Sequence, residues 1–504
     1  MSARFLTVLG LAVMVTALAW AAEEPAPQPT VVHTIVLRHG PPLGQTPEQA
    51  VEAGALPATV FEQGEPIDVA FTIENRGPGV VHGFDAGAGT RLPNYGVQVR
   101  DGAGRLVTDP GCGQTAWGPC IAGEWSLAPG QAHTWHLCLN YWVMPLAPGR
   151  YTVVGRYSQW DDPRRVLTQS APVAFEITTV SAAAQRARIE ALGRAVITAE
   201  GETLNQSLRY LGFIGTVEAM QRVVRGFYRG SEWAAYWAGE AFRCLADREA
   251  GRRLALAALQ SHGPEVHLAY LLRSYGVPQA DTLAATIKGL ANPDPQRRIQ
   301  AAAVLQGYRG AGEVPVDALL GALKDPAPQV RISAAVALTG YREPRINLAV
   351  LQVSYDRDPQ VRGVMIDVLG TMKATEAIPR LQEVLLTETE RNAWAACRGL
   401  ENIGTLAARD ALRKGLALPD WSMRTRCATS LLAIGDESVR PMLIEAIKTA
   451  PKEKKNSLWG WLVHAAEMRG SDKAPRDYLT YSEDMTPWIK WLEETPPTGP
   501  PLER

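Results

Sequence analysis

The chain has 504 residues, of which 46% are hydrophobic and 20% are charged, and its formal net charge is -1. This composition excludes a chain that is disordered over most of its length, because a sequence of this size and apolar content can bury a substantial core. The near-zero net charge argues against nonspecific nucleic-acid binding, which needs a basic surface to displace counterions from phosphates.

The first 22 residues have the pattern of a secretory signal peptide. A single arginine precedes an apolar run that ends at Ala19, and the small-x-small triplet that ends at Ala21 is a cleavage signal. The apolar run is about 15 residues long, which is short of the roughly 20 that span a bilayer. We therefore predict cleavage after Ala21 or Ala22, a Pro-rich linker at 23–30, and a periplasmic or secreted protein with no transmembrane segment after cleavage. An uncleaved membrane anchor is the alternative.

Export would place the six cysteines in an oxidising compartment. Cys112 and Cys120 bracket the loop GCGQTAWGPC, whose Gly and Pro content lets its ends meet, so we predict a disulfide between them, although spacing alone does not fix connectivity. The other four lie in predicted strands and helices, where cysteine usually acts as a small buried hydrophobe. None has the C-x-x-C spacing of a zinc or redox centre, and we predict no metal or cofactor.

Residues 31–180 are predicted to form an all-β sandwich. Runs rich in β-branched and aromatic residues alternate with turn signals: VVHTIVL, PIDVAFTIEN, YGVQVR, HTWHLCLNYWV, YTVVGRY and PVAFEITTV. About seven such strands in ~145 residues are typical of a sandwich. The wording FEQGEPIDVAFTIENRG and LAPGRYTVVGRY resembles the immunoglobulin-like domains of bacterial secreted proteins, with Tyr151 where those domains often carry a corner tyrosine. This resemblance implies a fold and no activity.

Aromatic residues are dense in this region and include Trp117, Trp125 and Trp160. A sandwich that exposed two or three of them in one plane would stack on sugar rings, whereas burial between the sheets is the commoner use of large aromatics. Nearby, His136 and Cys138 would share one strand face, but they are too few for a metal site.

From about residue 185 the sequence repeats one phrase: NPDPQRRIQAAAVL, DPAPQVRISAAVAL and DRDPQVRGVMIDVL. Its arginine moves from Arg298 to Arg331 to Arg362 in steps of 33 and 31, and the step of 31 then reaches Ala393 and Arg424. Such a period is typical of a repeat array. Each unit has two apolar stripes, so we predict a helix pair joined at an Asp-Pro turn, with Asp325 and Pro326 at the start of the second helix. The predicted α-solenoid occupies 185–470.

These phrases resemble HEAT-like repeats of the kind named from phycobilisome lyases, over about 190–470. The resemblance implies an all-α solenoid whose second helices line a concave surface, which usually binds another macromolecule. The lyase activity is not carried over, because that chemistry acts on cytoplasmic pigment proteins and this chain has the features of an exported one. In the capping segment and tail at 471–504, TPWIKWLEE resembles the closing helix of exported bacterial repeat proteins, with Trp488 and Trp491 covering the last repeat.

The repeated arginines have two interpretations. Arg298, Arg331, Arg362 and Arg424 would place like charges one repeat apart along the groove, a surface suited to an acidic partner. Alternatively each arginine pairs with a turn acid such as Asp294, Asp325 or Asp358 and orders the stack, which is the use that we favour because arginine forks matched to carboxylates are common structural devices.

No nucleophile elbow, P-loop, EF-hand or H-E-x-x-H motif is present. We therefore predict a multidomain, non-catalytic binding or scaffold protein with a protein partner and no nucleic-acid partner. A carbohydrate-binding component of a polysaccharide-processing system is the alternative, and an enzyme would need polar residues that converge from both domains. Residues 23–180 hold 9 basic and 15 acidic residues, a net charge of -6, whereas 181–504 hold 41 and 37, a net charge of +4. The β domain could therefore dock on the solenoid by charge, in a salt-sensitive manner.

Overall fold

The computed structural model describes residues 31–85, 95–107, 123–143, 145–158, 166–308, 316–339, 341, 343–388, 390–470, 474–475 and 484–494. The predicted signal peptide and linker lie outside these residues. The chain separates into two compact units, residues 1–257 and 258–504. Within the described ranges, no helix is long and apolar enough to cross a membrane.

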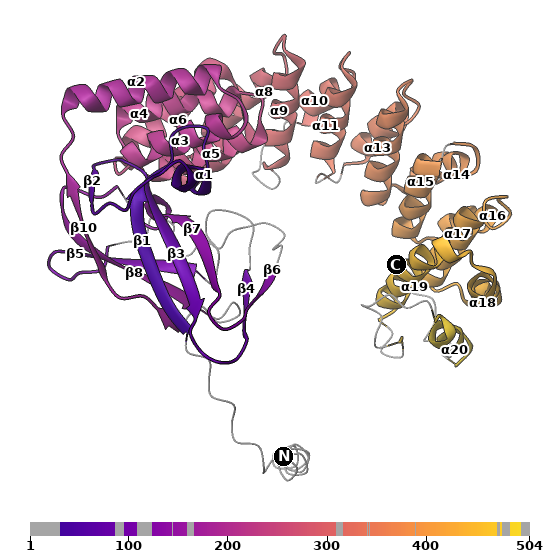
Figure 1. The fold of residues 1–504 in the computed structure, drawn as a ribbon. Coiled ribbons are helices and arrows are strands. Elements are labelled where there is room, and N and C mark those ends of the chain that lie inside the picture. The colour runs from indigo at the N-terminus through magenta and orange to yellow at the C-terminus, as the bar shows by residue number, and fades with distance from the viewer. Residues whose placement is uncertain are drawn as a thin grey trace, which may run out of the picture. The chain divides into compact units, whose positions relative to one another are not determined.

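The strands of the first unit form sheets (Figure 1). One antiparallel sheet has the order β1 (Val31–His39), β3 (Ile67–Asn75), β7 (Ala132–Cys138). The second sheet has the order β2 (Val60–Glu62), β10 (Val173–Thr178), β8 (Gly149–Ser158), β5 (Tyr95–Asp101), with β9 (Val166–Gln169) also paired to β8. Strands β4 (Val81–Asp85) and β6 (Gly123–Leu127) pair with each other. The six quoted runs fall on β1, β3, β5, β7, β8 and β10, so the predicted strand content of this region is confirmed.

Side chains from both larger sheets share one core, because apolar residues alternate along the strands. Gly155 of β8 marks a close approach between the sheets: a Cβ atom there would lie 2.6 Å from the Ile35 side chain and 2.9 Å from Phe71. Tyr151 donates its hydroxyl hydrogen to the carbonyl of Ala147 at 2.8 Å, four residues upstream, which is the contact of a tyrosine corner.

Helix α3 (Gly201–Ile214) fastens the strand region to the first helices through neutral hydrogen bonds. The buried Gln206 side chain accepts from the Gly44 amide and donates to the Gln45 carbonyl, both at 2.7 Å. Tyr210 donates to the Pro41 carbonyl at 2.9 Å. These contacts involve the segment between β1 and the short helix α1 (Pro47–Glu52).

Aromatic packing and one ion pair complete these contacts. The Tyr141 ring lies 5.3 Å from that of Phe213, edge to face. Arg188 of α2 (Ala182–Thr198) pairs with Glu62 at 2.5 Å. Because most of the contacts are uncharged, opposite net charges are not what holds the strands to these helices. Docking of the strands in the groove of the second unit stays a prediction. The first unit continues with α4 (Val217–Val223), α5 (Glu232–Arg243) and the start of α6 (Arg248–His262).

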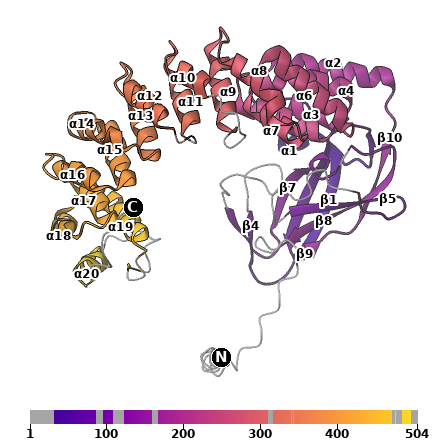
Figure 2. The same cartoon turned by 180° about the vertical axis from the view of Figure 1, so that it is seen from behind.

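The second unit is a series of helices in two layers (Figures 1 and 2). After α7 (Val266–Ser274) and α8 (Gln279–Gly289), one layer holds α9 (Pro295–Gln306), α11 (Pro328–Leu338), α13 (Pro359–Thr371), α15 (Glu390–Ile403), α17 (Trp421–Ala433) and α19 (Lys455–Met468). The other holds α10 (Val316–Ala322), α12 (Pro344–Val353), α14 (Ile378–Thr387), α16 (Leu406–Gly415) and α18 (Arg440–Thr449). Both views show α13, α15 and α17 on the inner side of the curve of this unit, as predicted for the second helix of each pair. We call their layer the inner layer.

The start of the inner helices corrects one prediction. Helix α11 begins at Pro328 with Ala327 as its N-cap, so the expected role of Asp325 and Pro326 was wrong. The capping aspartate stands two residues later in the phrase: Asp294 caps α9 and Asp358 caps α13, each followed by proline. Asp325 instead accepts from the Ala327 amide at 2.9 Å and is left available for a second partner.

Helix α20 (Thr486–Glu494) covers the end of the second unit. Trp488 is completely buried, and its ring lies 5.5 Å from that of Trp459 in α19. Arg440 of α18 donates to the Leu492 carbonyl at 2.6 Å. Trp491 is also buried, so both tryptophans lie where a capping helix needs apolar side chains.

Candidate functional site

The repeated arginines join successive turns of the second unit. Arg331 donates from Nη1 to the carbonyls of Asp325 and Pro326, at 2.8 and 3.2 Å. Its Nη2 donates to the Asp356 carboxylate, in the turn of the next repeat, at 2.8 Å. One guanidinium therefore holds two turns together.

The same geometry recurs on either side. Arg298 binds Asp325 in a bidentate pair at 2.7 and 2.8 Å, and Arg362 donates through Nε to Glu388 at 3.2 Å. Each also donates to two carbonyls of its own turn. We call Arg298, Arg331, Arg362 and their acids Asp325, Asp356 and Glu388 the arginine ladder.

The ladder acids are ionised at neutral pH. Burial opposes ionisation of Asp325, but the Arg298 guanidinium and the Ala327 amide outweigh it and hold the pKa of that carboxyl below its usual value. Burial likewise opposes ionisation of Asp356, whose pKa is held low by the Asp358 amide and by Arg331. The ladder arginines therefore use their donors within the chain, and a partner-binding role for them stays a prediction.

Arg424 differs from the other three. It donates to the carbonyls of Leu418 and Pro419 at 2.7 and 2.6 Å, but within the described residues it contacts no carboxylate. The structure places it at the same position in its helix and leaves part of its guanidinium for another partner.

The solvent side of the inner layer carries equivalent residues from repeat to repeat. On α15, Arg391, Trp394 and Arg398 remain exposed or half-exposed, at spacings of three and four residues that place them on one stripe. The equivalent positions, which we call the inner stripe with those three, are Gln296, Ile299 and Ala303 in α9, Gln329, Ile332 and Val336 in α11, and Gln360, Gly363 and Asp367 in α13.

Contacts between neighbouring helices show that these positions lie side by side. Gln329 donates to the Gln360 side-chain oxygen at 3.2 Å, and Arg398 pairs with Asp367 at 2.5 Å. The middle row has half-exposed apolar side chains at Ile299, Ile332 and Trp394. The inner stripe is therefore a mixed surface with an apolar centre and an amide row at one side, and it is distinct from the arginine ladder.

A buried polar cluster ends the inner stripe at α17. Glu401, whose side chain is 2% exposed, accepts from Arg426 at 2.9 Å and from Ser430 at 2.5 Å, and pairs with His464 of α19 at 2.5 Å. Burial opposes ionisation of Glu401, but these donors hold its pKa low, and Glu401 in turn raises the pKa of His464. Trp394 and Trp461 approach to 5.1 Å between ring centres, which joins α15 to α19. The cluster has no motif in the sequence, because its members are 25 to 63 residues apart.

The candidate residues of the strand region have a plainer role. Trp125 is half-buried, packs against the core and stacks on His133 at 5.2 Å, which weakens the carbohydrate alternative. Trp117, Trp160, Cys112 and Cys120 lie outside the described residues, so their predicted roles stay predictions.

His136 and Cys138 do share one strand face, but each has a local partner. His136 donates to Asp68 of β3 at 3.0 Å, with both side chains buried, and Cys138 contacts the Asn140 side chain at 3.6 Å. Burial raises the pKa of the Cys138 thiol to about 12, so it is not a thiolate at neutral pH. In the part of the chain that the structure describes, no group of three or more His, Cys, Asp or Glu residues could hold a metal ion.

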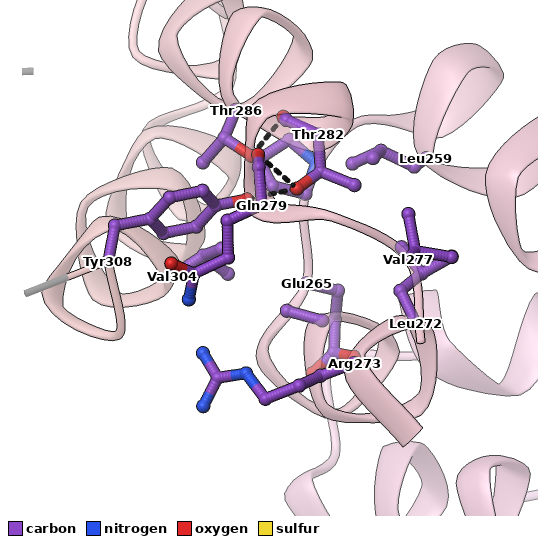
Figure 3. A pocket seen from close by; sticks show the side chains of 12 residues that line it. Leu259, Glu265, Leu272, Arg273, Val277, Gln279, Thr282, Thr286, Val304 and Tyr308 are labelled. Carbon is purple, nitrogen blue, oxygen red and sulfur yellow. Dashed lines mark hydrogen bonds between the residues drawn. The ribbon is translucent and has the colours of Figure 1, made fainter. Parts of the chain in front are cut away.

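A small cavity lies between α7, α8 and α9 (Figure 3). Glu265 caps α7 by accepting from the Leu268 amide at 2.8 Å, and burial raises the pKa of its carboxyl to about 7. Thr282 and Tyr308, which hydrogen-bond to each other, line another side. The cavity volume is about 20 Å³, enough for one water molecule. The arrangement holds an acid that can be neutral at physiological pH, with no room for a substrate.

A larger cleft of about 450 Å³ lies in the first unit, beside β2, α2 and α3. His39 pairs with Glu65, and Arg188 pairs with Glu62, along its wall. Because these charged side chains are paired within the chain, the cleft favours no ligand of particular charge.

Comparison with known proteins identifies the repeat. The family model for HEAT repeats matches residues 346–417 and 386–457. The chain contains HEAT repeats. The matched ranges cover α12 to α18, so they include the later part of the arginine ladder and of the inner stripe. No curated protein matches the chain.

Several solved structures resemble the HEAT-repeat part of the chain. An engineered protein is 18% identical, with a TM-score of 0.32, and the match covers 58% of this chain and 92% of that chain. The complex of CpcE and CpcF of phycocyanin lyase from Nostoc is 24% identical, with a TM-score of 0.28 and coverage of 45% and 91%. Importin beta is 14% identical, with a TM-score of 0.38 and coverage of 58% and 49%. These TM-scores are low, so the assignment of HEAT repeats rests on the family model and on the repeat geometry.

In this chain the HEAT repeats separate two kinds of residue. The invariant part of the repeated phrase, the arginine and the acid of the next turn, is used to join repeats. The variable positions that follow the arginine face solvent on the inner layer. The sequence analysis singled out the arginines and missed the inner stripe, although the aligned phrases contain it one and five residues after each arginine.

Proposed function

We propose that the chain is an exported, non-catalytic scaffold that binds a protein partner through the inner stripe of its HEAT repeats. The observation that carries the proposal is the half-exposed apolar row of Ile299, Ile332 and Trp394 along consecutive inner helices. HEAT repeats are typical of protein-binding scaffolds, and an extended surface of this kind offers contact area without a deep pocket.

The chemistry of the inner stripe favours a protein over a polyanion. Helices α9 and α11 present Gln, Ile, Ala and Val there, with no lysine or arginine among the stripe positions. A nucleic acid would need a continuous basic track to displace its counterions. An apolar row flanked by amides instead suits a partner helix or strand that buries apolar side chains and hydrogen-bonds at its edge.

The strand region would then act as an immunoglobulin-like domain that adds a second contact or positions the solenoid. The tyrosine-corner contact of Tyr151 supports that fold, and the pattern of the first 22 residues supports export. Intact-mass measurement of the chain from a periplasmic or culture fraction tests export: we expect a mature chain that begins after Ala21 or Ala22. Recovery of the uncut chain from the cytoplasm alone would contradict it.

The binding proposal is tested with the full-length chain as bait. Ile299 and Ile332 are both changed to Lys, because a lysine stem can lie along an apolar surface while its charge remains in water. A matched control changes Leu348 and Leu406, which are 53% and 76% exposed on α12 and α16 of the other layer, to Lys. Circular dichroism and thermal midpoints establish that both variants fold.

We expect partners captured by the wild-type chain to be lost with the inner variant and kept with the outer one. Equal capture by the two variants would show that the inner stripe is not the binding surface. Loss with the outer variant alone would move the surface to the other layer.

A further inference from the structure

Two cysteines meet between adjacent inner helices of the HEAT repeats. The sulfur atoms of Cys397 in α15 and Cys427 in α17 lie 4.0 Å apart, 30 residues apart in sequence, and both side chains are completely buried. They are not bonded to each other in the structure. A shift of about 2 Å would bring the sulfurs to the disulfide length of roughly 2.05 Å.

These positions belong to a regular contact between repeats. The residues one repeat earlier are Ile366 and Ala396, and those two repeats before that are Ala302 and Ala334, all completely buried. At the α15–α17 step both positions are cysteine. Packing alone is met by alanine or isoleucine elsewhere, so the chemistry that cysteine adds here is the ability to form a bond.

The surroundings leave room for both sulfurs. A Cβ atom on Gly415 of α16 would lie 2.5 Å from the Cys427 sulfur, so glycine there gives the sulfur its space. On the other side, Ser430 places its hydroxyl oxygen 3.4 Å from the Cys397 sulfur. The thiol pair is thus enclosed by small groups on adjacent helices.

We propose that Cys397 and Cys427 form a disulfide that clamps two neighbouring HEAT repeats. Two thiols lose two protons and two electrons, the sulfur–sulfur bond forms, and the electrons reduce a disulfide oxidant of the glutathione class to two thiols. Because neither sulfur is exposed in the folded chain, the exchange takes place while the chain folds, before α17 is covered.

Refolding of the full-length chain tests the bond directly. Reduced, denatured protein is refolded either with dithiothreitol or with a mixture of oxidised and reduced glutathione, then denatured, alkylated and digested with trypsin. We expect the peptide of residues 392–398 to be joined to that of residues 427–448 after oxidative refolding only. Folded protein in which both thiols are alkylated after oxidative refolding, or in which either is joined to another cysteine, would overturn the proposal.

A thermal measurement separates this bond from other disulfides. The control replaces Cys397 and Cys427 with Ala together, which reproduces the pair at Ala302 and Ala334. Closing a loop of 30 residues should raise the thermal midpoint of the oxidised wild type by roughly 5–15 °C over its reduced form. We expect the double variant to lack this difference. A difference of the same size in the double variant would assign the effect to another bond and refute the clamp.

Discussion

Replacing Arg331 with Met breaks the arginine ladder at its most buried member. The Arg331 side chain is 8% exposed and that of Asp356 is 12% exposed. Methionine keeps the apolar stem but removes both carbonyl contacts and the ion pair. The Asp356 carboxylate would then stay charged with one fewer donor in a partly buried turn.

The magnitude follows from what remains. Loss of one partner of a buried ion pair costs about 3–5 kcal/mol. Asp356 keeps the Asp358 amide at 2.9 Å and some exposure to water, so we expect the lower part of this range, about 2–4 kcal/mol. Changing Asp356 to Asn as well removes the uncompensated charge, so the double variant should be more stable than Arg331→Met alone, with a coupling of about 1–3 kcal/mol.

Hydrogen exchange read by mass spectrometry is the suitable assay, because repeat arrays open locally rather than all at once. We expect faster exchange in α11 and α13 and little change in α18 and α19. Arg424→Met is the matched control: it loses two carbonyl contacts and no carboxylate, so its local effect should be smaller. Unchanged exchange in α11 and α13 would refute the structural role of the ladder and return these arginines to the binding surface.

Three further predictions follow from single sites. The pKa of Glu265 is raised from 4.5 to about 7, so its neutral form is favoured on folding: the stability it contributes is complete below pH 4.5 and falls by roughly 3 kcal/mol as pH rises to 7, whereas Glu265→Gln should remove this slope in pH-dependent denaturation. Gly415→Ala should cost about 1–3 kcal/mol by crowding the Cys427 sulfur, while Gly460→Ala in α19, where a Cβ atom meets nothing within 4 Å, should be neutral or stabilising in thermal scans. Gln206→Ala should lower the free energy of opening of the β1–α1 segment by about 1–3 kcal/mol, equally at low and high salt, and a strong salt dependence in hydrogen exchange would contradict the uncharged contacts described for α3.

The sequence predicted the repeat because the ladder residues recur at fixed spacing, and it predicted strands because apolar residues alternate. It misplaced the N-cap because the phrase offers two acids, and only one of them can cap the helix while the other accepts from the next arginine. Helix α1 was missed inside the strand region, although Thr46 and Gln49 form a capping box that the letters TPEQ contain. The Glu401 cluster had no such signal, because three different helices must pack before its charges meet.

The four arginines that the sequence treats as equivalent divide into two groups for a physical reason. The ladder acids stand 25 to 27 residues after their arginines, at Asp325, Asp356 and Glu388. The corresponding step from Arg424 leads to the end of α18, where the sequence reads TAPKEK and Ala450 occupies the position. With no acid there, Arg424 keeps its two carbonyl contacts and leaves its remaining donors unused by a carboxylate. An acidic side chain on a partner could therefore bind Arg424 without breaking any contact between repeats, whereas binding at Arg298, Arg331 or Arg362 would have to displace an acid of the chain itself.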